Sequence, residues 1–358
     1  MALKYEVNKV KIDLENFRFY IRGLPKIGKT SFFRDFILEN YGDAKYGLLI
    51  SLGQENGFKA LSNITAVQAV DWNEFTEVVD DLVENKSDNE FKFVCLDTVD
   101  RVFEIAEDKV LAIHRSQKGE AAFSIDAALG GFAKGKSKAR VLVEKQVARL
   151  ENAGYGMMWL GHTKLKSVGD QVTDVVFEKV TGSMEFKYDA LFSDRADFTV
   201  MLATESIAKD AKFVEAKRYF YFRSTPTIDA GSRVPAEFLP EKIEYSARAF
   251  IDTVTVALEK TAGVSGKDAD KLRKEQEKER LQKANEFSQK EKKEKDVEGL
   301  SLEQFIDLLN TTAKGLSPED RNEKIAELKS NDLPSTPKAF KEIESIEIAQ
   351  KVHKILTS

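Results

Sequence analysis

The chain has 358 residues, of which 42% are hydrophobic and 32% are charged, and its formal net charge is −5. The hydrophobic fraction is large enough to bury a sizeable core, which excludes a wholly disordered chain. The slight acidity excludes a surface that attracts nucleic acid over the whole molecule, so any such contact has to come from a local patch. Because single domains usually stop growing at about 250–300 residues, the length indicates one large domain with an appendage.

Cysteine is scarce, and the amino-terminal sequence carries no export signal. The single cysteine, Cys95, excludes an intramolecular disulfide and a cysteine-based zinc site. The first residues lack the apolar segment of a signal peptide, and no apolar run reaches the roughly 20 residues that span a bilayer. We therefore expect a cytoplasmic protein without membrane contact.

Short apolar runs alternate with amphipathic stretches over residues 1–250. The pattern predicts strands at 17–22, 46–51, 91–97 and 156–161, with helices between them at 30–39, 72–84, 99–114 and 137–152. Strands that alternate with helices are typical of an α/β fold with a mainly parallel central sheet. Further strands are expected at 198–203, 218–223 and 243–245, and they indicate a hairpin extension.

The composition changes after residue 262. Residues 263–299 are mostly Lys, Glu, Gln and Arg, so this segment is expected to be a charged helical or disordered linker. Residues 300–358 regain helical periodicity and predict a small helical module. The predicted organisation is a core at 1–262, a linker at 263–299 and a carboxyl-terminal helical extension at 300–358.

One motif carries the clearest chemistry. The sequence GLPKIGKT, preceded by an apolar strand and followed by an amphipathic helix, matches the P-loop pattern GxxxxGK[ST] in full. Its main-chain N–H groups turn toward phosphate oxygens, its lysine reaches the β- and γ-phosphates, and its threonine hydroxyl is a ligand for Mg²⁺. ATP and Mg²⁺ are therefore the expected cofactors. The predicted nucleotide-binding residues are Gly23, Leu24, Pro25, Lys26, Ile27, Gly28, Lys29, Thr30 and Ser31.

Three further residues are candidates for the same site. Asp97 ends the apolar strand FVCLD and is the expected Walker B acid, which holds Mg²⁺ together with Thr30. The next residue is Thr98 rather than the glutamate found in many ATPases, so Glu55, in the segment LGQENG, is the candidate that orients the attacking water. Glu55 is expected beside the edge of the P-loop strand. His162 follows the strand GMMWLG and is a candidate sensor of the γ-phosphate.

The chain resembles the RecA-like ATPases encoded by bacteriophages, a group that contains single-strand annealing proteins. The resemblance covers roughly residues 15–250 and rests on GLPKIGKTSF, QENG, CLDTVDRV, LGGFAKGKSKAR, LENAGYGMMWLGHTK and DRADFTVML. It implies a RecA-like core and a DNA-stimulated ATPase that anneals or pairs single-stranded DNA in phage recombination or replication. It also implies the host cytoplasm, a ring or filament of identical subunits, and an arginine or lysine acting on the neighbouring subunit's ATP. Arg223 and Arg233 are the preferred candidates, over Lys217 and Arg218.

Contacts with DNA are expected from two segments. The stretch 130–149 is the clearest basic island of the chain, and its glycines suit a loop that follows phosphates. A solubilising loop that leads into a helix is the other interpretation. The second segment, Lys164–Lys187, is a DNA-binding loop in the proteins that the chain resembles. The candidate DNA-binding residues are Phe132, Lys134, Lys136, Lys138 and Arg140.

Other functions stay open at the level of the sequence. A hexameric helicase or helicase loader would use the same motifs. A nucleotide or nucleoside kinase would share the P-loop, although the sequence shows no compact lid. A protein in which the nucleotide is purely structural is a further alternative. The carboxyl-terminal module could bind a single-strand binding protein or serve only for packing and solubility.

Overall fold

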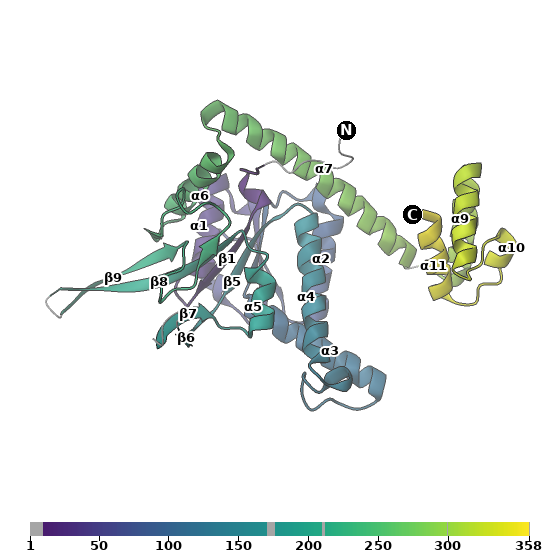
Figure 1. The fold of residues 1–358 in the computed structure, drawn as a ribbon, viewed down its shortest axis with the longest axis horizontal. Coiled ribbons are helices and arrows are strands. Elements are labelled where there is room, and N and C mark those ends of the chain that lie inside the picture. Colours follow the sequence, from purple (N-terminus) through teal and green to yellow (C-terminus); the bar gives the residue numbers. More distant parts are fainter. Residues whose placement is uncertain (1–9, 170–175, 210–211, 299, 358) are drawn as a thin grey trace. The chain divides into compact units, whose positions relative to one another are not determined.

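The fold was obtained as a computed structural model, which describes residues 10–169, 176–209, 212–298 and 300–357. The described residues divide after Ser288 into two compact units, and the first contains the sheet (Figure 1). The strands are β1 (Arg18–Gly23), β2 (Gly47–Leu52), β3 (Ala66–Ala69), β4 (Phe93–Asp97), β5 (Gly156–Gly161), β6 (Thr163–Gly169), β7 (Val176–Gly182), β8 (Phe198–Lys209), β9 (Lys212–Tyr221), β10 (Gly231–Ser232) and β11 (Lys242–Glu244). The helices are α1 (Lys29–Tyr41), α2 (Trp72–Glu84), α3 (Val99–Lys118), α4 (Lys134–Asn152), α5 (Phe186–Ser193), α6 (Ala247–Ala262), α7 (Gly266–Glu298), α8 (Leu302–Gly315), α9 (Pro318–Ser330), α10 (Pro337–Phe340) and α11 (Ile346–Thr357).

The central sheet has the order β11-β9-β8-β1-β5-β4-β2-β3. The neighbours from β8 to β3 are parallel, whereas β9 and β11 continue the sheet as antiparallel strands. The predicted α/β fold with a mainly parallel sheet and carboxyl-terminal helices is confirmed. Strand β5 separates the P-loop strand β1 from the Walker B strand β4, so the polar ends of all three strands meet at one edge of the sheet.

Helices cover both faces of the sheet, and the alternation of side chains along each strand explains how. Phe19 and Ile21 of β1 point to the face that α1 and α6 cover, whereas Tyr20 points to the face of α2, α3, α4 and α5. All residues of β4 and β5 are buried, as expected for central strands with both faces covered. The site at the sheet edge therefore rests on a rigid base.

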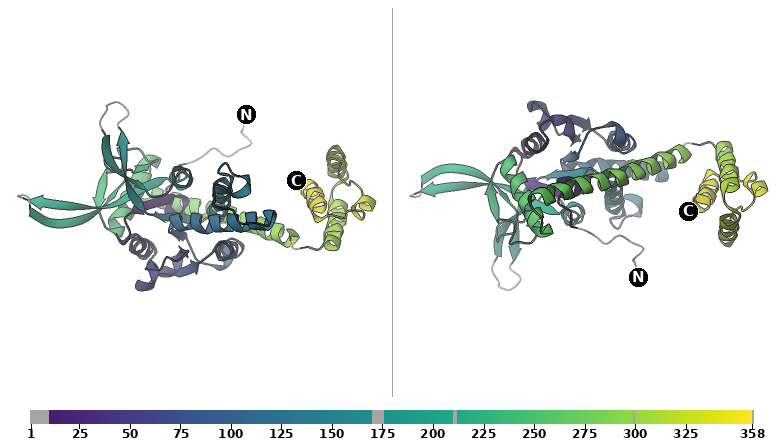
Figure 2. Two further views of the ribbon diagram at one scale, coloured as in Figure 1. Left: turned by 90° about the horizontal axis from the view of Figure 1, so that it is seen from below. Right: turned by 90° about the horizontal axis from the view of Figure 1, so that it is seen from above.

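Two antiparallel hairpins, β6–β7 and β8–β9, extend from the same end of the first unit (Figure 2). The predicted hairpin extension is thus present. The strands β3 and β10, four and two residues long, are additions that the sequence pattern did not indicate, because such short segments carry too little periodicity.

The segment 263–299, expected to be a charged helical or disordered linker, consists largely of the helix α7, and most of α7 belongs to the first unit. The boundary between the units lies after Ser288 rather than at residue 262. Gln276 accepts the main-chain N–H of Ile12 at 2.8 Å, and the buried Arg280 contacts Glu15 and the carbonyl oxygen of Gly154. A few residues of this charged helix therefore attach it to the core. The average composition of the segment does not reveal these contacts.

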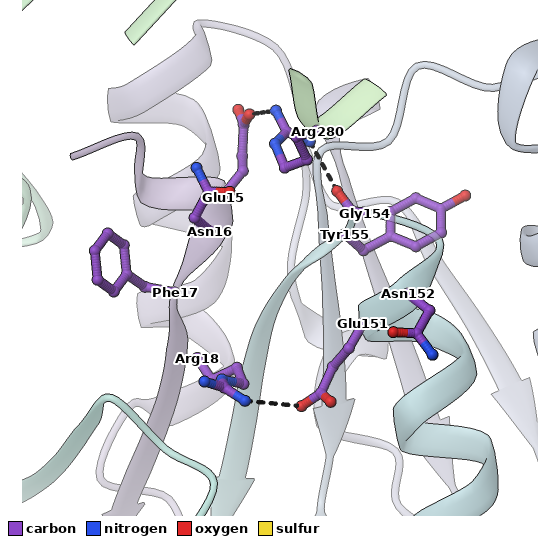
Figure 3. Close-up of a pocket in the computed structure, with 9 residues that line it drawn as sticks. All are labelled: Glu15, Asn16, Phe17, Arg18, Glu151, Asn152, Gly154, Tyr155 and Arg280. Atoms are coloured by element: carbon purple, nitrogen blue, oxygen red, sulfur yellow. Dashed lines mark hydrogen bonds and ion pairs between the residues drawn. The ribbon is translucent and has the colours of Figure 1, made fainter. Parts of the chain in front are cut away.

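The attachment of α7 borders a pocket of about 270 Å³, where β1 and β5 begin (Figure 3). Arg280 fills one side of it, and Arg18 lies 3.8 Å from Glu151 on the other. Since β1 begins here and ends at the P-loop, this pocket lies at the edge opposite the nucleotide-binding motif. Removing one partner of a buried ion pair such as Arg280–Glu15 typically costs about 3–5 kcal/mol, so α7 contributes to the stability of the core.

The second unit has its own hydrophobic core, in which Phe305, Leu309, Phe340 and Val352 are fully buried. It contains the end of α7 together with α8, α9, α10 and α11, and α8 begins with a capping box made by Ser301 and Gln304. The apolar stripe at 302–309 thus packs within a small helical bundle, as the periodicity predicted.

Candidate nucleotide site

The P-loop joins β1 to α1 and takes a conformation that its glycines permit. Gly28 has a φ of 110° and precedes α1, and a Cβ atom on Gly23 would lie 2.8 Å from the carbonyl oxygen of Leu202. Helix α1 has no side-chain cap and no acidic residue in its first turn. Its first N–H groups therefore have no partner within the helix and face outward as donors, which suits phosphate oxygens.

Lys29 lies inside the P-loop. Its Nζ donates to the carbonyl oxygens of Gly23 at 2.8 Å and Leu24 at 3.1 Å, and the residue is 6% exposed. Burial lowers the pKa of Lys29 to about 8, while the negative charges of Asp97 and Glu55 oppose that shift. The ammonium group is thus held at the loop with little water around it, where an anion would bind strongly.

Thr30 and Asp97 meet at the junction of α1 and β4. The hydroxyl of Thr30 donates to Asp97 Oδ2 at 2.8 Å. Burial raises the pKa of Asp97 to about 6, and the hydrogen bond from Thr30 opposes the shift. A hydroxyl and a single carboxylate fit Mg²⁺, which keeps several waters and otherwise binds substrate phosphates. The described residues include no cluster of three or more acidic, histidine or cysteine side chains that would form an all-protein cage.

Glu55 reaches this site from a different direction than expected. Its strand, β2, lies beside the Walker B strand β4 and not beside the P-loop strand. The loop after β2 folds back, since a Cβ atom on Gly57 would lie 3.4 Å from Thr30 Oγ1. The charge of Glu55 accordingly acts on the pKa values of Lys29, Asp97 and His162. Arg101 Nε lies 3.4 Å from Glu55 Oε1.

His162 follows a strand, β5, as its motif predicted, and β5 lies between the P-loop strand β1 and the Walker B strand β4. Burial and the nearby charge of Lys29 lower its pKa below the ordinary value, so the imidazole is neutral at pH 7. A neutral imidazole can accept or donate a hydrogen bond toward a phosphate. His162 therefore belongs to the same electrostatic cluster as Lys29, Asp97 and Glu55.

The arginines predicted to act on a neighbouring subunit lie apart from the P-loop of their own chain. Arg223 is exposed after β9. Arg233 contacts Asp197 at 3.4 Å and the carbonyl oxygen of Asp194 at 2.6 Å, near the start of β1. This position is at the edge of the sheet opposite the P-loop, and a role for either arginine in a neighbouring site stays a prediction.

Arg218 and Tyr245 lie beside the P-loop of their own chain, whereas the sequence interpretation considered Arg218 only for a neighbouring subunit's site and did not single out Tyr245. Arg218 Nη1 donates to the carbonyl oxygen of Ile27 at 2.8 Å, and its guanidinium lies 3.9 Å from the centre of the Tyr245 ring. The Tyr245 hydroxyl donates to the carbonyl oxygen of Gly28 at 3.2 Å. Both residues come from strand regions about 190–220 residues further along the chain, and no local motif marks them.

The basic island predicted to bind DNA is mostly helical. Lys134, Lys136, Lys138 and Arg140 lie in the first two turns of α4 rather than on a flexible loop, since α4 begins at Lys134. Lys136 is partly neutralised, because its Nζ lies 3.2 Å from Asp126 and 2.9 Å from Glu185. The preceding Phe132 is 96% exposed.

The second DNA candidate, Lys164–Lys187, contains the hairpin β6–β7 and the start of α5, and its residues 170–175 lie outside the described residues. The contact between Lys136 and Glu185 brings the two candidate segments together. Phe123, in the loop between α3 and α4, and Phe186, the first residue of α5, are 102% and 85% exposed and were missed by the sequence interpretation. The sequence feature that could have identified them is a single aromatic residue within an otherwise polar stretch.

The two shifted pKa values predict the pH dependence of Mg²⁺–ATP affinity. The Asp97 carboxylate forms as pH rises through about 6, and Lys29 loses its charge as pH rises through about 8. Affinity should therefore be greatest between these values and fall on both sides, by up to about tenfold per pH unit. Calorimetric titrations across this range test the profile. Asp97→Asn should flatten the acidic limb relative to the wild type, and an unchanged acidic limb in that variant would contradict the assignment.

A family model described as an AAA domain matches residues 15–234. The chain belongs to the AAA domain family. The match includes the P-loop, Glu55, Asp97 and His162, so the AAA domain supplies every residue of the cluster described above. This family assignment identifies a P-loop nucleoside triphosphatase.

Comparison with solved structures finds a KaiC-like protein from the hyperthermophilic archaeon Pyrococcus horikoshii. It is 12% identical, with a TM-score of 0.34, and the match covers 65% of this chain and 90% of the archaeal chain. A comparison with curated proteins gives no match. In the part of the chain that the structure describes, no helix is long and apolar enough to cross a membrane.

Proposed function

We propose that the chain hydrolyses ATP with Mg²⁺ and that single-stranded DNA stimulates the reaction, in the setting of phage recombination or replication. The observation that carries the enzymatic part is the convergence of four elements on one edge of the sheet. The P-loop brings Lys29, α1 brings Thr30, β4 brings Asp97, and the loop after β2 brings Glu55. Each of these groups suits one requirement of phosphoryl transfer to water.

The roles follow from the contacts. The ammonium group of Lys29, which donates to two main-chain carbonyl oxygens in this structure, turns to the terminal phosphates and neutralises their charge. The N–H groups of the P-loop bind phosphate oxygens. Thr30 and Asp97 would hold Mg²⁺, whose chemistry is to neutralise charge on the phosphate oxygens. Glu55 is the carboxylate that orients the attacking water, and Arg101 holds its side chain in place. His162 forms a hydrogen bond with the γ-phosphate when ATP is bound.

Support for single-stranded DNA comes from exposed aromatic and basic side chains of two segments of the first unit, which together we name the aromatic surface. The segments are the stretch from the loop between α3 and α4 into the start of α4, and the start of α5, and Lys136 links them through its contacts with Asp126 and Glu185. Aromatic faces stack on unpaired bases, whereas lysines contact phosphates, and this combination favours single strands over duplex. The members of the aromatic surface are Phe123, Phe132, Phe186, Lys134, Lys138 and Lys187.

The aromatic surface provides a test of DNA binding that does not depend on hydrolysis. Phe132→Ala and Phe123→Ala should each weaken binding to a fluorescent oligothymidine by about 5–150-fold, the loss expected from one stacked base. Fluorescence anisotropy measures the affinity. Val256→Ala, which changes an exposed residue of α6, is the matched control and should bind like the wild type. Equal affinity of the wild type for single and double strands, or no loss in either phenylalanine variant, would contradict the DNA assignment.

Assembly into a ring or filament is a further part of the proposal. Arg223, exposed at the end of β9, is the better candidate for completing a neighbouring site, because the guanidinium of Arg233 already has partners within its own chain. Strand annealing is the activity that we propose for such an assembly. Release of inorganic phosphate, rather than a phosphorylated nucleotide, distinguishes this function from that of a kinase.

A further inference from the structure

Asp100 connects the Walker B region to both ends of the hairpin β6–β7. It lies in the first turn of α3, three residues after Asp97. Its Oδ2 accepts the main-chain N–H of His162 at 2.9 Å, and its Oδ1 accepts the hydroxyl of Ser183. His162 directly precedes β6 and Ser183 directly follows β7, so one carboxylate holds the two ends of the hairpin.

The backbone at the base of the hairpin closes around this carboxylate. Ser183 N–H donates to the carbonyl oxygen of His162 at 3.0 Å, which pairs the two residues that Asp100 binds. The Asp100 side chain is 16% exposed. A largely buried carboxylate that accepts two hydrogen bonds is costly to leave without them, so the contact ties movement at the start of α3 to movement of the hairpin.

A second polar connection joins the same hairpin to the P-loop strand. Arg22, the residue before Gly23, has a side chain that is 2% exposed and lies 2.8 Å from Asp229 and 3.5 Å from Asp189. Asp229 N–H donates to the carbonyl oxygen of Val180 in β7 at 3.1 Å. Because the Arg22 guanidinium is almost fully buried, its charge depends on these two carboxylates, so the connection is firm.

The two connections begin at the two elements between which the phosphates of a nucleotide bind. Arg22 is continuous with the P-loop, and Asp100 is continuous with Asp97. A bound phosphate would compete with the carbonyl oxygens of Gly23 and Leu24 for Lys29 Nζ. Its negative charge would act on Asp100 and His162, because the charge of Asp100 already acts on Lys29 and the charge of Lys29 already acts on His162. The Asp100 connection is therefore the one on which the charge of a bound phosphate would act, whereas the Arg22 connection supports the hairpin through a buried cation.

We infer that Asp100 is a positioning residue that makes the conformation of the hairpin β6–β7 depend on the bound nucleotide. This inference rests on the nucleotide binding of the proposed function and not on DNA binding. Asp100 acts through the main chain of His162 and the side chain of Ser183. The hairpin thereby becomes the element through which ATP binding changes the surface of the protein next to α5.

Hydrogen exchange measured by mass spectrometry tests the inference on the full chain without DNA. The wild type is compared with Mg²⁺–ADP, with a non-hydrolysable ATP analogue and Mg²⁺, and without nucleotide. Exchange at 163–169 and 176–182 should differ by at least about twofold between the ATP-like and nucleotide-free states. In Asp100→Ala this difference should disappear, while the affinity for the analogue changes by less than about threefold.

Two variants sharpen the comparison. Ser183→Ala removes only the hydroxyl donor and should reduce the difference in exchange even if Asp100→Ala does not fold. Asp108→Ala changes an exposed carboxylate of the same helix and should behave like the wild type. The inference would be overturned if both Asp100→Ala and Ser183→Ala kept the wild-type difference in hydrogen exchange between the ATP-like and nucleotide-free states. It would also be overturned if the wild type bound the analogue and showed no such difference. A loss of affinity beyond about tenfold in Asp100→Ala would place Asp100 in the binding site and also overturn it. A wild type that does not bind nucleotide would refute the proposed function itself, and the inference with it.

Discussion

Replacement of Lys29 by alanine is expected to reduce ATP hydrolysis by at least about 100-fold, the usual effect of removing one preorganised group that stabilises the transition state. Lys29 is the buried cation of the P-loop, and its ammonium lies against two main-chain carbonyl oxygens where the phosphates would bind. Since charge develops on the phosphate oxygens during the reaction, removing the ammonium should lower kcat as well as nucleotide affinity. Phosphate release at saturating ATP measures the effect.

The matched control for this variant is Lys260→Ala. Lys260 is an exposed lysine near the end of α6, so its replacement changes the net charge equally without touching the P-loop. Its phosphate release should equal that of the wild type. Equal rates in Lys29→Ala and Lys260→Ala would contradict the placement of the reaction at the P-loop.

Replacement of Glu55 by glutamine should lower kcat by about 100- to 10,000-fold, the range for removing a general base. Glutamine keeps the size of the side chain and removes the negative charge that would orient and polarise the attacking water. The affinity for ATP should stay within about threefold of the wild type, because Glu55 acts on the water and not on the nucleotide. Single-turnover hydrolysis, combined with nucleotide titration, separates the two quantities.

Glu104→Gln is the control for the Glu55 variant. Glu104 contacts the same arginine, with Arg101 Nη1 at 2.6 Å from Glu104 Oε2, but is more exposed on α3. Its loss should change hydrolysis little. Unchanged turnover in Glu55→Gln would show that another group orients the water, or that the nucleotide is structural.

The parts of the site that the sequence predicted share a local origin. The P-loop residues lie within nine positions, and their spacing alone fixes a strand, a turn and a helix start. Asp97 could be predicted because an apolar run places its last residue at the sheet edge. The apolar run before His162 likewise placed this residue at the end of a strand, whereas the neighbourhood of that strand and the Walker B strand is what the resemblance to RecA-like proteins implied, and β5 does pair with β4.

The parts that the sequence did not predict depend on contacts between distant segments. Glu55 reaches the site through a loop that folds back from β2. Its position depends on the order of the strands in the sheet, and the sequence of a single strand does not determine that order. Arg218 contacts Ile27 in the P-loop of its own chain across 191 positions, and no spacing rule predicts that contact. In the sequence, Asp100 is an ordinary acidic residue of a first helical turn. Its role becomes visible only in the structure, where it accepts hydrogen bonds from His162 and Ser183.

Helix α7 illustrates a different limit. Its composition resembles that of a solvated linker, yet Gln276 and Arg280 have specific partners in the core at Ile12 and Glu15. The composition of a helix is an average over all of its faces, so it does not reveal the one face that packs against the core. The same averaging applies to the net charge of −5, which conceals the lysines of the aromatic surface.

The most direct test of the central claim is ATP hydrolysis by the wild-type chain with Mg²⁺, measured as phosphate release with and without single-stranded DNA. The account predicts Mg²⁺-dependent release of phosphate that is lost in Lys29→Ala and that rises when oligothymidine is added. Hydrolysis that does not respond to DNA would contradict the proposed role on DNA. Absence of phosphate release under all these conditions would contradict the assignment of the chain as an ATPase.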